Sequence, residues 1–183
     1  PVAQIGKKHR KFCYRLRNSD GALSSCWKIK YKNNTYLLLN GHQLSGGDYV
    51  EQGSEKYLLP DPKSGEWMKP FIHKDIYLLK WDYFNGHGPA GQPAKIEVTN
   101  APVSQNLTFV GYDPDTAELV TTGCGLVKTT PEFLQYNVST KPGSCGSGIL
   151  CSMEGKIYLV GVHNFTTGAS NYPNGALRTV TKK

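Results

Sequence analysis

Long hydrophobic runs are missing from this chain. None of its apolar stretches approaches the roughly 18 residues that a membrane-spanning helix needs. No secretory signal peptide opens the sequence, and the start at Pro1-Val2 suggests a recombinant start or a piece cut from a longer precursor. We therefore expect a chain without a membrane segment.

Paired cysteines are missing as well. An odd count without paired spacing argues against a disulfide framework and favours a reducing compartment. Because there is no C-x-x-C pair and no histidine-rich cluster, a structural zinc site is not expected, and nothing else predicts a metal or a cofactor. All cysteines except Cys145 are interpreted as small buried hydrophobic residues. The five cysteines are Cys13, Cys26, Cys124, Cys145 and Cys151.

What is present is an ordinary globular composition with an excess of positive charge. Of the 183 residues, 38% are hydrophobic and 19% are charged, which suits one domain or two small ones. The net charge is +7, and part of it lies in residues 7–11, KKHRK. Lys28, Lys30 and Lys32 alternate with apolar residues. That alternation is typical of a strand with one solvated face, and binding of nucleic acid through its phosphates is the alternative.

Short strands separated by turns dominate the pattern, and helical pieces are expected only near residues 7–12 and after His42. Many short strands between glycine- and proline-rich turns are typical of sandwiches and barrels. The stretch 86–93, GHGPAGQP, divides the chain into halves of similar size. We predict an all-β protein of two antiparallel barrels, with residues 1–88 as the first, 89–104 as a linker region and 105–183 as the second. The predicted strands span residues 12–16, 26–31, 35–39, 76–81, 94–98, 107–112, 118–122, 126–129, 149–152 and 156–162.

The most informative segment is residues 142–148, PGSCGSG, which directly precedes an apolar stretch. Glycine adopts backbone conformations closed to other residues and lets a ligand approach the main chain. A cysteine on such a turn can lie beside backbone N–H groups, as an acyl-transfer nucleophile requires. A glycine-rich surface loop with an incidental thiol at Cys145 is the alternative.

A cysteine nucleophile needs a base, and histidine is the usual one. His42 follows an apolar strand through Asn40-Gly41, a place at a barrel rim that suits a functional side chain. His9 lies in the basic N-terminal segment and His87 in the glycine- and proline-rich stretch 86–93, so both suit this role less well. A purely structural histidine is the alternative at His42.

Three segments together resemble the picornavirus 3C-type cysteine proteases, which have the chymotrypsin fold. Residues 38–42, LLNGH, look like the strand and turn that present the catalytic histidine. Residues 136–146, YNVSTKPGSCG, resemble the nucleophile segment, and residues 160–163, VGVH, match the strand that follows it. Their order and spacing also agree with the family.

The resemblance implies two chymotrypsin-like barrels with short helical pieces and an active site in the cleft between the barrels. His42 would serve as general base and then as general acid, and Cys145 would form a thioester acyl-enzyme. The backbone N–H groups of Cys145 and of Gly143 or Ser144 would form the oxyanion hole.

The third catalytic residue in this family is an Asp or Glu that opens a strand after the histidine-bearing region. Asp75 matches that place, since an apolar strand directly follows it and would set its carboxylate at a barrel edge. Asp48, Glu51 and Asp82 are the alternatives, and each is more simply interpreted as a solvated surface residue.

The resemblance also implies a pocket for the side chain that precedes the cleaved bond, the S1 pocket. His163 and Thr140 would bind the amide of a glutamine, and Tyr136 would bind the other ring nitrogen of His163 and hold that ring neutral. A site of this kind penalises substrates that leave its buried donors unpaired.

The expected function is that of a viral polyprotein-processing cysteine endopeptidase that cuts after glutamine, with glutamate as a second option. Its substrates would be viral polyproteins, and it would act in the reducing host cytoplasm after release from a polyprotein. The alternative from another class is a basic two-barrel module that binds viral RNA and whose cysteine is idle. The two are compatible, because the resembling family does both. A secreted trypsin-like hydrolase is disfavoured by the cysteine nucleophile and by the missing disulfide pattern.

Overall fold

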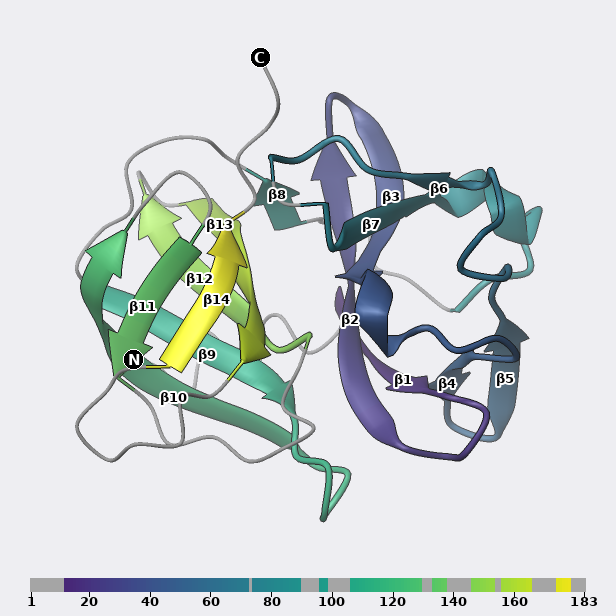
Figure 1. Cartoon of the computed structure of the whole chain (residues 1–183), viewed down its shortest axis with the longest axis horizontal. Helices are drawn as coiled ribbons and strands as arrows, with labels where there is room; N and C mark the ends of the chain where they lie inside the picture. Colours follow the sequence, from purple (N-terminus) through teal and green to yellow (C-terminus); the bar gives the residue numbers. More distant parts are fainter. Residues whose placement is uncertain are drawn as a thin grey trace.

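The computed structural model describes residues 12–72, 74–89, 96–98, 106–129, 133–137, 146–153, 156–165 and 174–178. These residues form β-strands almost throughout, with short 3-10 helices over residues 41–43 and 81–84. Most strands belong to one of two antiparallel lobes that lie side by side (Figure 1). The prediction of an all-β protein is confirmed.

The first lobe, coloured purple to teal in Figure 1, is a curled antiparallel sheet with the strand order β5-β4-β1-β2-β3-β7-β6. Among the described residues no ladder joins β5 to β6, so this lobe is an open half-barrel. The strands are β1 (Cys13–Arg17), β2 (Leu23–Tyr31), β3 (Asn34–Asn40), β4 (Tyr49–Gln52), β5 (Glu55–Leu58), β6 (Trp67–Met68) and β7 (Ile76–Lys80).

The second lobe, coloured from the teal of β9 through green to yellow, closes on itself (Figure 1). Its ladders run from β12 through β9, β10, β11, β14 and β13 and return to β12, so every strand has a neighbour on both sides. Closure removes exposed sheet edges. The strands are β9 (Asn106–Tyr112), β10 (Leu119–Thr129), β11 (Phe133–Asn137), β12 (Gly148–Met153), β13 (Lys156–Phe165) and β14 (Asn174–Arg178).

A short strand connects the two lobes. β8 (Ile96–Val98) pairs in parallel with β2 on one side and with β13 on the other. Figure 1 shows it between the lobes. It falls within the region 89–104 expected to be a linker, and the domain boundaries given above stay a prediction.

Apolar side chains pack in three clusters, one inside each lobe and one between the lobes. β3 shows why: Leu37 and Leu39 point into the first lobe, whereas Tyr36 and Leu38 point toward the second. Since successive strand residues face opposite sides, a strand buried on both faces reads as a continuous apolar run. The cluster between the lobes includes Trp27, Ile29, Leu38, Ile76, Val110, Leu150, Leu159 and Val162.

The lysines around β2 do not share the solvated face that their alternation predicts. Lys28 is buried, and its Nζ lies 4.4 Å from the centroid of the Trp81 ring. Lys32 lies in the turn after β2, with its Nζ 5.4 Å from the Tyr31 ring. A cation is attracted to the electron-rich face of an aromatic ring, which offsets part of the cost of burying Lys28. The interpretation of one wet lysine face is therefore wrong at Lys28.

Each predicted strand overlaps a strand of the structure, but the boundaries differ. β10 is one continuous strand where two were predicted, over 118–122 and 126–129, because it pairs with β9 up to Gly125 and with β11 from Gly125 onward. The sequence pattern does not predict β4, β5, β6, β11 or β14. The helical piece expected after His42 includes His42 itself, and the piece near residues 7–12 lies outside the described residues apart from Phe12.

No helix in the described part of the chain is long and apolar enough to cross a membrane.

Candidate active site

The strand ends next to His42 and Asp75 lie side by side. β3 and β7 pair antiparallel, with Asn40 opposite Ile76. His42 follows β3 on a 3-10 turn, η2 (Gly41–Gln43), and Asp75 directly precedes β7. Antiparallel pairing sets the end of one strand beside the start of its neighbour. This is how two residues far apart in the sequence come into contact.

The Asp75 carboxylate holds His42 with both of its oxygens. Its Oδ2 lies 2.7 Å from His42 Nδ1, and its Oδ1 accepts the His42 backbone N–H at 2.9 Å. An ionised carboxylate only accepts hydrogen bonds, so the proton of the neutral ring lies on Nδ1 and the lone pair on Nε2. The His42 side chain is 46% exposed and the Asp75 side chain 22% exposed, so the imidazole is accessible from solvent.

Gly41 allows the turn that carries His42 to pack closely against β7. A Cβ atom at this position would lie 2.4 Å from the ring of Tyr77, which is closer than any real contact. The Gly41 N–H donates to the Asp75 carbonyl at 2.6 Å. The orientation of His42 is thus fixed through its backbone as well as through its ring.

The nearer alternatives to Asp75 have other partners. Asp48 is buried and accepts hydrogen bonds from the Ser45 hydroxyl and from the backbone N–H groups of Ser45 and Gly46. Glu51 forms an ion pair with Arg17 at 3.3 Å. Asp48 therefore shapes a turn and Glu51 neutralises an arginine, whereas Asp75 contacts His42.

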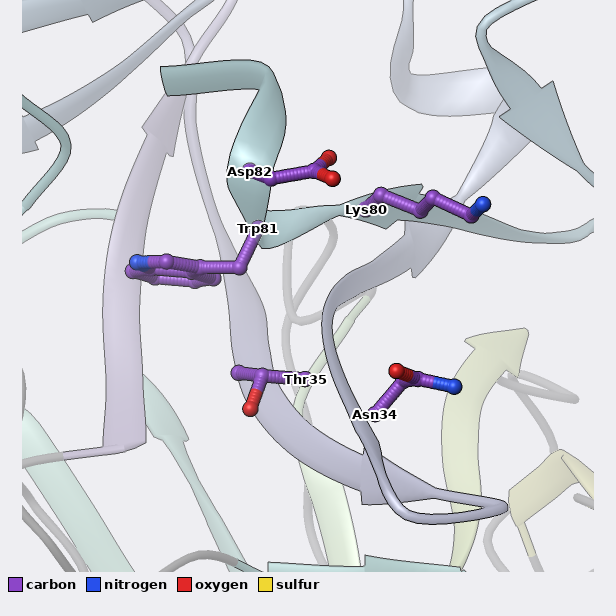
Figure 2. Close-up of a pocket in the computed structure, with 5 residues that line it drawn as sticks. All are labelled: Asn34, Thr35, Lys80, Trp81 and Asp82. Atoms are coloured by element: carbon purple, nitrogen blue, oxygen red, sulfur yellow. The ribbon is translucent and has the colours of Figure 1, made fainter. Parts of the chain in front are cut away.

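Asp82 lies toward the opposite end of β7 from Asp75. It belongs to a second 3-10 turn, η3 (Trp81–Phe84), and Lys80 before it pairs with Tyr36 rather than with the His42 end of β3. A pocket of about 240 Å³ opens there, and Figure 2 shows Asp82 and Lys80 extending to one side of it and the Trp81 indole to the other. The pocket is lined by Asn34, Thr35, Lys80, Trp81 and Asp82.

Of residues 142–148, the structure describes those from Gly146 onward. Cys145, Gly143, Ser144 and Thr140 lie outside the described residues. The Gly146 N–H donates to the His163 carbonyl at 2.9 Å, and the His163 N–H donates to the Ser147 carbonyl at 2.7 Å. The residue directly after Cys145 in the sequence is therefore tied to the strand that carries His163.

Gly146 also packs tightly against the first lobe. Its carbonyl accepts a hydrogen bond from Trp27 Nε1 at 2.8 Å. Its φ is +84°, a conformation that L side chains rarely adopt, and a Cβ there would lie 2.0 Å from the Ser25 carbonyl oxygen. Only glycine fits this position.

His163 is buried and held neutral. Only 1% of the residue is exposed, and burial lowers the pKa of His163 to about 4, because an apolar environment disfavours the charged ring. Its Nδ1 hydrogen-bonds the Tyr136 hydroxyl. The Phe109 ring packs edge to face against the imidazole, with 5.6 Å between the two ring centroids. A phenol is the stronger acid of the pair, so Tyr136 donates and the imidazole proton lies on Nε2. The structure thus brings Tyr136 and His163 together, in the contact that the family resemblance implies.

Asn40 contacts the candidate site, and the sequence pattern does not identify it. Its Nδ2 donates to the His163 carbonyl at 3.0 Å, across the interface between the lobes. Trp27 and Ser25 were likewise not identified. The only signal in the sequence is the polar Asn40 at the end of an apolar strand, two residues before His42.

Three of the described cysteines are buried and are thiols rather than disulfides, namely Cys13, Cys26 and Cys151. Burial raises the pKa of Cys13 and of Cys26, so neither is a ready nucleophile. This agrees with their interpretation as core residues, and the side chain of Cys124 lies outside the described part. Among the described residues, no three His, Cys, Asp or Glu side chains lie together as metal ligands.

Structural comparison places the chain among two-barrel proteins of the chymotrypsin-like fold. The human astrovirus serine protease matches with a TM-score of 0.64 at 17% identity, over 92% of this chain and 89% of that one. The tobacco vein mottling virus protease matches with a TM-score of 0.65 at 18% identity, over 95% and 79%. A catalytically inactive tobacco etch virus protease complexed with substrate matches with a TM-score of 0.65 at 14% identity, over 94% and 79%.

Comparison of sequences adds no relative: no protein-family model and no curated protein matches this chain. At these identities the structural likeness shows the fold alone. The resemblance to picornavirus 3C-type proteases stays a prediction.

Proposed function

We propose that this chain is a cysteine endopeptidase that processes viral polyproteins by cutting after glutamine, with glutamate as a second option. Cys145 is its nucleophile, His42 its base and Asp75 the residue that orients the base. The observation that carries the proposal is the His42–Asp75 pair, in which the carboxylate holds Nδ1 and leaves the lone pair on Nε2. The viral proteases that share the fold support the same class of activity.

The reaction follows from these roles. His42 Nε2 takes the proton of the Cys145 thiol, and the sulfur attacks the carbonyl carbon of the scissile peptide. The backbone N–H groups of Cys145 and of Gly143 or Ser144 stabilise the oxyanion that forms. The imidazolium then gives its proton to the amine as the C–N bond breaks. Water hydrolyses the thioester that remains, with His42 again as the base.

Selectivity for glutamine rests on the neutral His163 ring. With Tyr136 donating to Nδ1, Nε2 carries the proton and can donate to a side-chain amide oxygen. The lowered pKa of His163 keeps the ring uncharged at neutral pH, so a charged carboxylate gains no ion pair there. Thr140 supplies a second hydrogen bond in this proposal. The site therefore favours glutamine over glutamate.

The test is cleavage of a peptide that contains a single Gln–Gly bond, followed by mass spectrometry of the products. The wild-type protein should cut that bond, and the Cys145→Ala and His42→Ala variants should not. Cys151→Ala is the matched control, because Cys151 is a buried cysteine on the strand just after the same segment, and it should cut normally. Cleavage that persists in Cys145→Ala would rule out Cys145 as the nucleophile.

Binding of viral RNA stays a second, compatible proposal. Its support is the net charge of +7 and the cluster at residues 7–11, which lies outside the described residues. Because Lys28 is buried against Trp81, it does not add to a surface cation patch. Affinity for single-stranded RNA measured at rising salt should fall steeply, and a flat response would argue against phosphate contacts.

A further inference from the structure

The backbone carbonyl of His163 is a junction between three segments of the chain. It accepts hydrogen bonds from the Gly146 N–H at 2.9 Å and from Asn40 Nδ2 at 3.0 Å. Asn40 ends β3 two residues before His42, and Gly146 directly follows Cys145. One acceptor therefore ties the turn of the proposed base to the turn of the proposed nucleophile.

Asn40 is suited to this task because it is fully buried and its backbone is fixed. Its N–H lies 3.3 Å from Gln43 Oε1, and the residue pairs with Ile76 in the β3–β7 ladder. Burying a polar side chain costs free energy unless it makes hydrogen bonds, and an apolar residue could fill the same space. The Asn40 amide makes such a bond across the interface, from its Nδ2 to the His163 carbonyl.

Trp27 holds the same turn from a second direction. Its Nε1 donates to the Gly146 carbonyl at 2.8 Å, while the Gly146 N–H is bound to His163. The N–H of Gly146 is thus hydrogen-bonded to the second lobe, and its carbonyl is hydrogen-bonded to the first lobe. The indole N–H and the Asn40 amide come from neighbouring strands, β2 and β3, of the first lobe.

We propose that Asn40 and Trp27 are positioning residues that fix the turn after Cys145 against the first lobe. They thereby set the separation of the Cys145 thiol from the His42 imidazole. The inference rests on the proposed peptidase activity. Thiol and base must be within hydrogen-bond reach, and a misplacement of 1 Å costs about 100-fold in rate.

The test compares Asn40→Ala and Trp27→Phe with wild type in peptidase kinetics and in the pH dependence of Cys145 alkylation by iodoacetamide. Phenylalanine keeps an aromatic ring in the core but removes the N–H donor. We expect kcat to fall about 10- to 100-fold in each variant with KM changed less than threefold. The apparent pKa of the Cys145 thiol should rise toward about 8.5, the ordinary value for cysteine, as the imidazole moves away.

The matched control is Asn34→Ala. Asn34 begins the same strand that Asn40 ends, but its side chain is exposed and donates to the nearby Lys32 carbonyl at 3.3 Å. This variant should keep the kcat and the thiol pKa of wild type. Near-UV circular dichroism and thermal unfolding establish that each variant is folded before its kinetics are compared.

The outcomes separate this inference from the proposed function. If wild type cuts no peptide and Cys145 is alkylated like a free thiol, the proposed function fails. If wild type is active but a folded Asn40→Ala or Trp27→Phe matches it within twofold in kcat and thiol pKa, the positioning role is wrong. If neither variant folds, the bonds serve stability and the inference is overturned too.

Discussion

At the residue scale, the carboxylate of Asp75 controls which nitrogen of His42 carries the proton. Asp75→Asn keeps the size of the side chain but offers an amide that can donate to Nδ1, which would move the proton to Nε2. We expect kcat to fall about 100-fold, less than the loss of roughly 10⁴ typical of serine enzymes, because a thiol depends less on its base. Steady-state kinetics with the Gln–Gly peptide measure the effect.

Glu51→Gln is the control for this substitution, since it neutralises a carboxylate that pairs with Arg17 and not with His42. Its kcat should equal that of wild type. If kcat fell equally in both variants, the negative charge of the first lobe would be what matters, rather than the contact of Asp75 with the imidazole.

Buried His163 makes the stability of the protein depend on pH. Its pKa is lowered to about 4 in the folded chain, against about 6.5 when unfolded, so the unfolded state binds the extra proton between these values. Stability is therefore lost as the pH falls from 6.5 toward 4. Between pH 7 and pH 4.5 the free energy of unfolding of wild type should fall by about 2–3 kcal/mol more than that of His163→Gln. Urea unfolding at both pH values measures these free energies. An equal loss of stability in wild type and in His163→Gln would contradict the burial of a neutral ring.

At the scale of elements, the turn between the nucleophile segment and β12 needs a glycine for two separate reasons. Gly146 combines a φ of +84° with a Cβ position 2.0 Å from the Ser25 carbonyl, whereas Gly21 has a φ of +85° and open space around its Cβ position. Gly21→Ala should lower the free energy of unfolding by about 1 kcal/mol, from backbone strain alone. Gly146→Ala should cost at least about 2 kcal/mol more, because the clash is with backbone. Chemical denaturation of the two variants measures the difference between their free energies of unfolding. Equal losses of stability in the two variants would show that the turn at Gly146 can shift to accept a Cβ atom.

Some elements were predictable because their residues specify them locally. β3 and β7 are continuous apolar runs, and they are buried on both faces, so both were expected. β5 is mostly exposed, and its pattern, EKYL, indicates no strand; pairing with β4 alone forms it. β10 was predicted as two strands, 118–122 and 126–129, yet pairing with β9 and with β11 makes it one. Such pairing depends on residues far away in the sequence, which a local pattern cannot supply.

The candidate site divides in the same way. Asp75 beside His42 and Tyr136 beside His163 were both expected because the family resemblance implies them, and the apolar strand after Asp75 favoured it over the other acidic residues. The bonds of Asn40 to His163 and of Trp27 to Gly146 join residues 123 and 119 positions apart, and no spacing rule predicts them. They arise only once the two lobes are packed together.

At the scale of the whole molecule, a hairpin of the second lobe is fastened to the first lobe. Arg15 on β1 donates to the Ala117 carbonyl from Nε at 3.2 Å and from Nη2 at 3.0 Å, and its guanidinium lies 4.6 Å from the Tyr112 ring centroid. Arg15→Ala should lower the free energy of unfolding by about 1–3 kcal/mol. The transition should stay single, because the apolar cluster between the lobes joins them.

Arg17→Ala is the control, as Arg17 lies on the same strand and pairs with Glu51 near the surface. The free energy of unfolding of Arg17→Ala should be lower than that of wild type by about 1 kcal/mol or less. Two separate unfolding transitions in Arg15→Ala would show instead that this contact, rather than the shared core, unites the lobes.

The most direct measurement of the central claim is intact-mass analysis of the protein after rapid mixing with the Gln–Gly peptide and an acid quench. A thioester acyl-enzyme should add the mass of the N-terminal product peptide less one water, and proteolytic mapping should place the adduct on Cys145. Asp75→Asn should form the same adduct more slowly, and Cys145→Ala should form none. Cleavage of the peptide with no adduct, or with an adduct on another residue, would contradict the proposed mechanism.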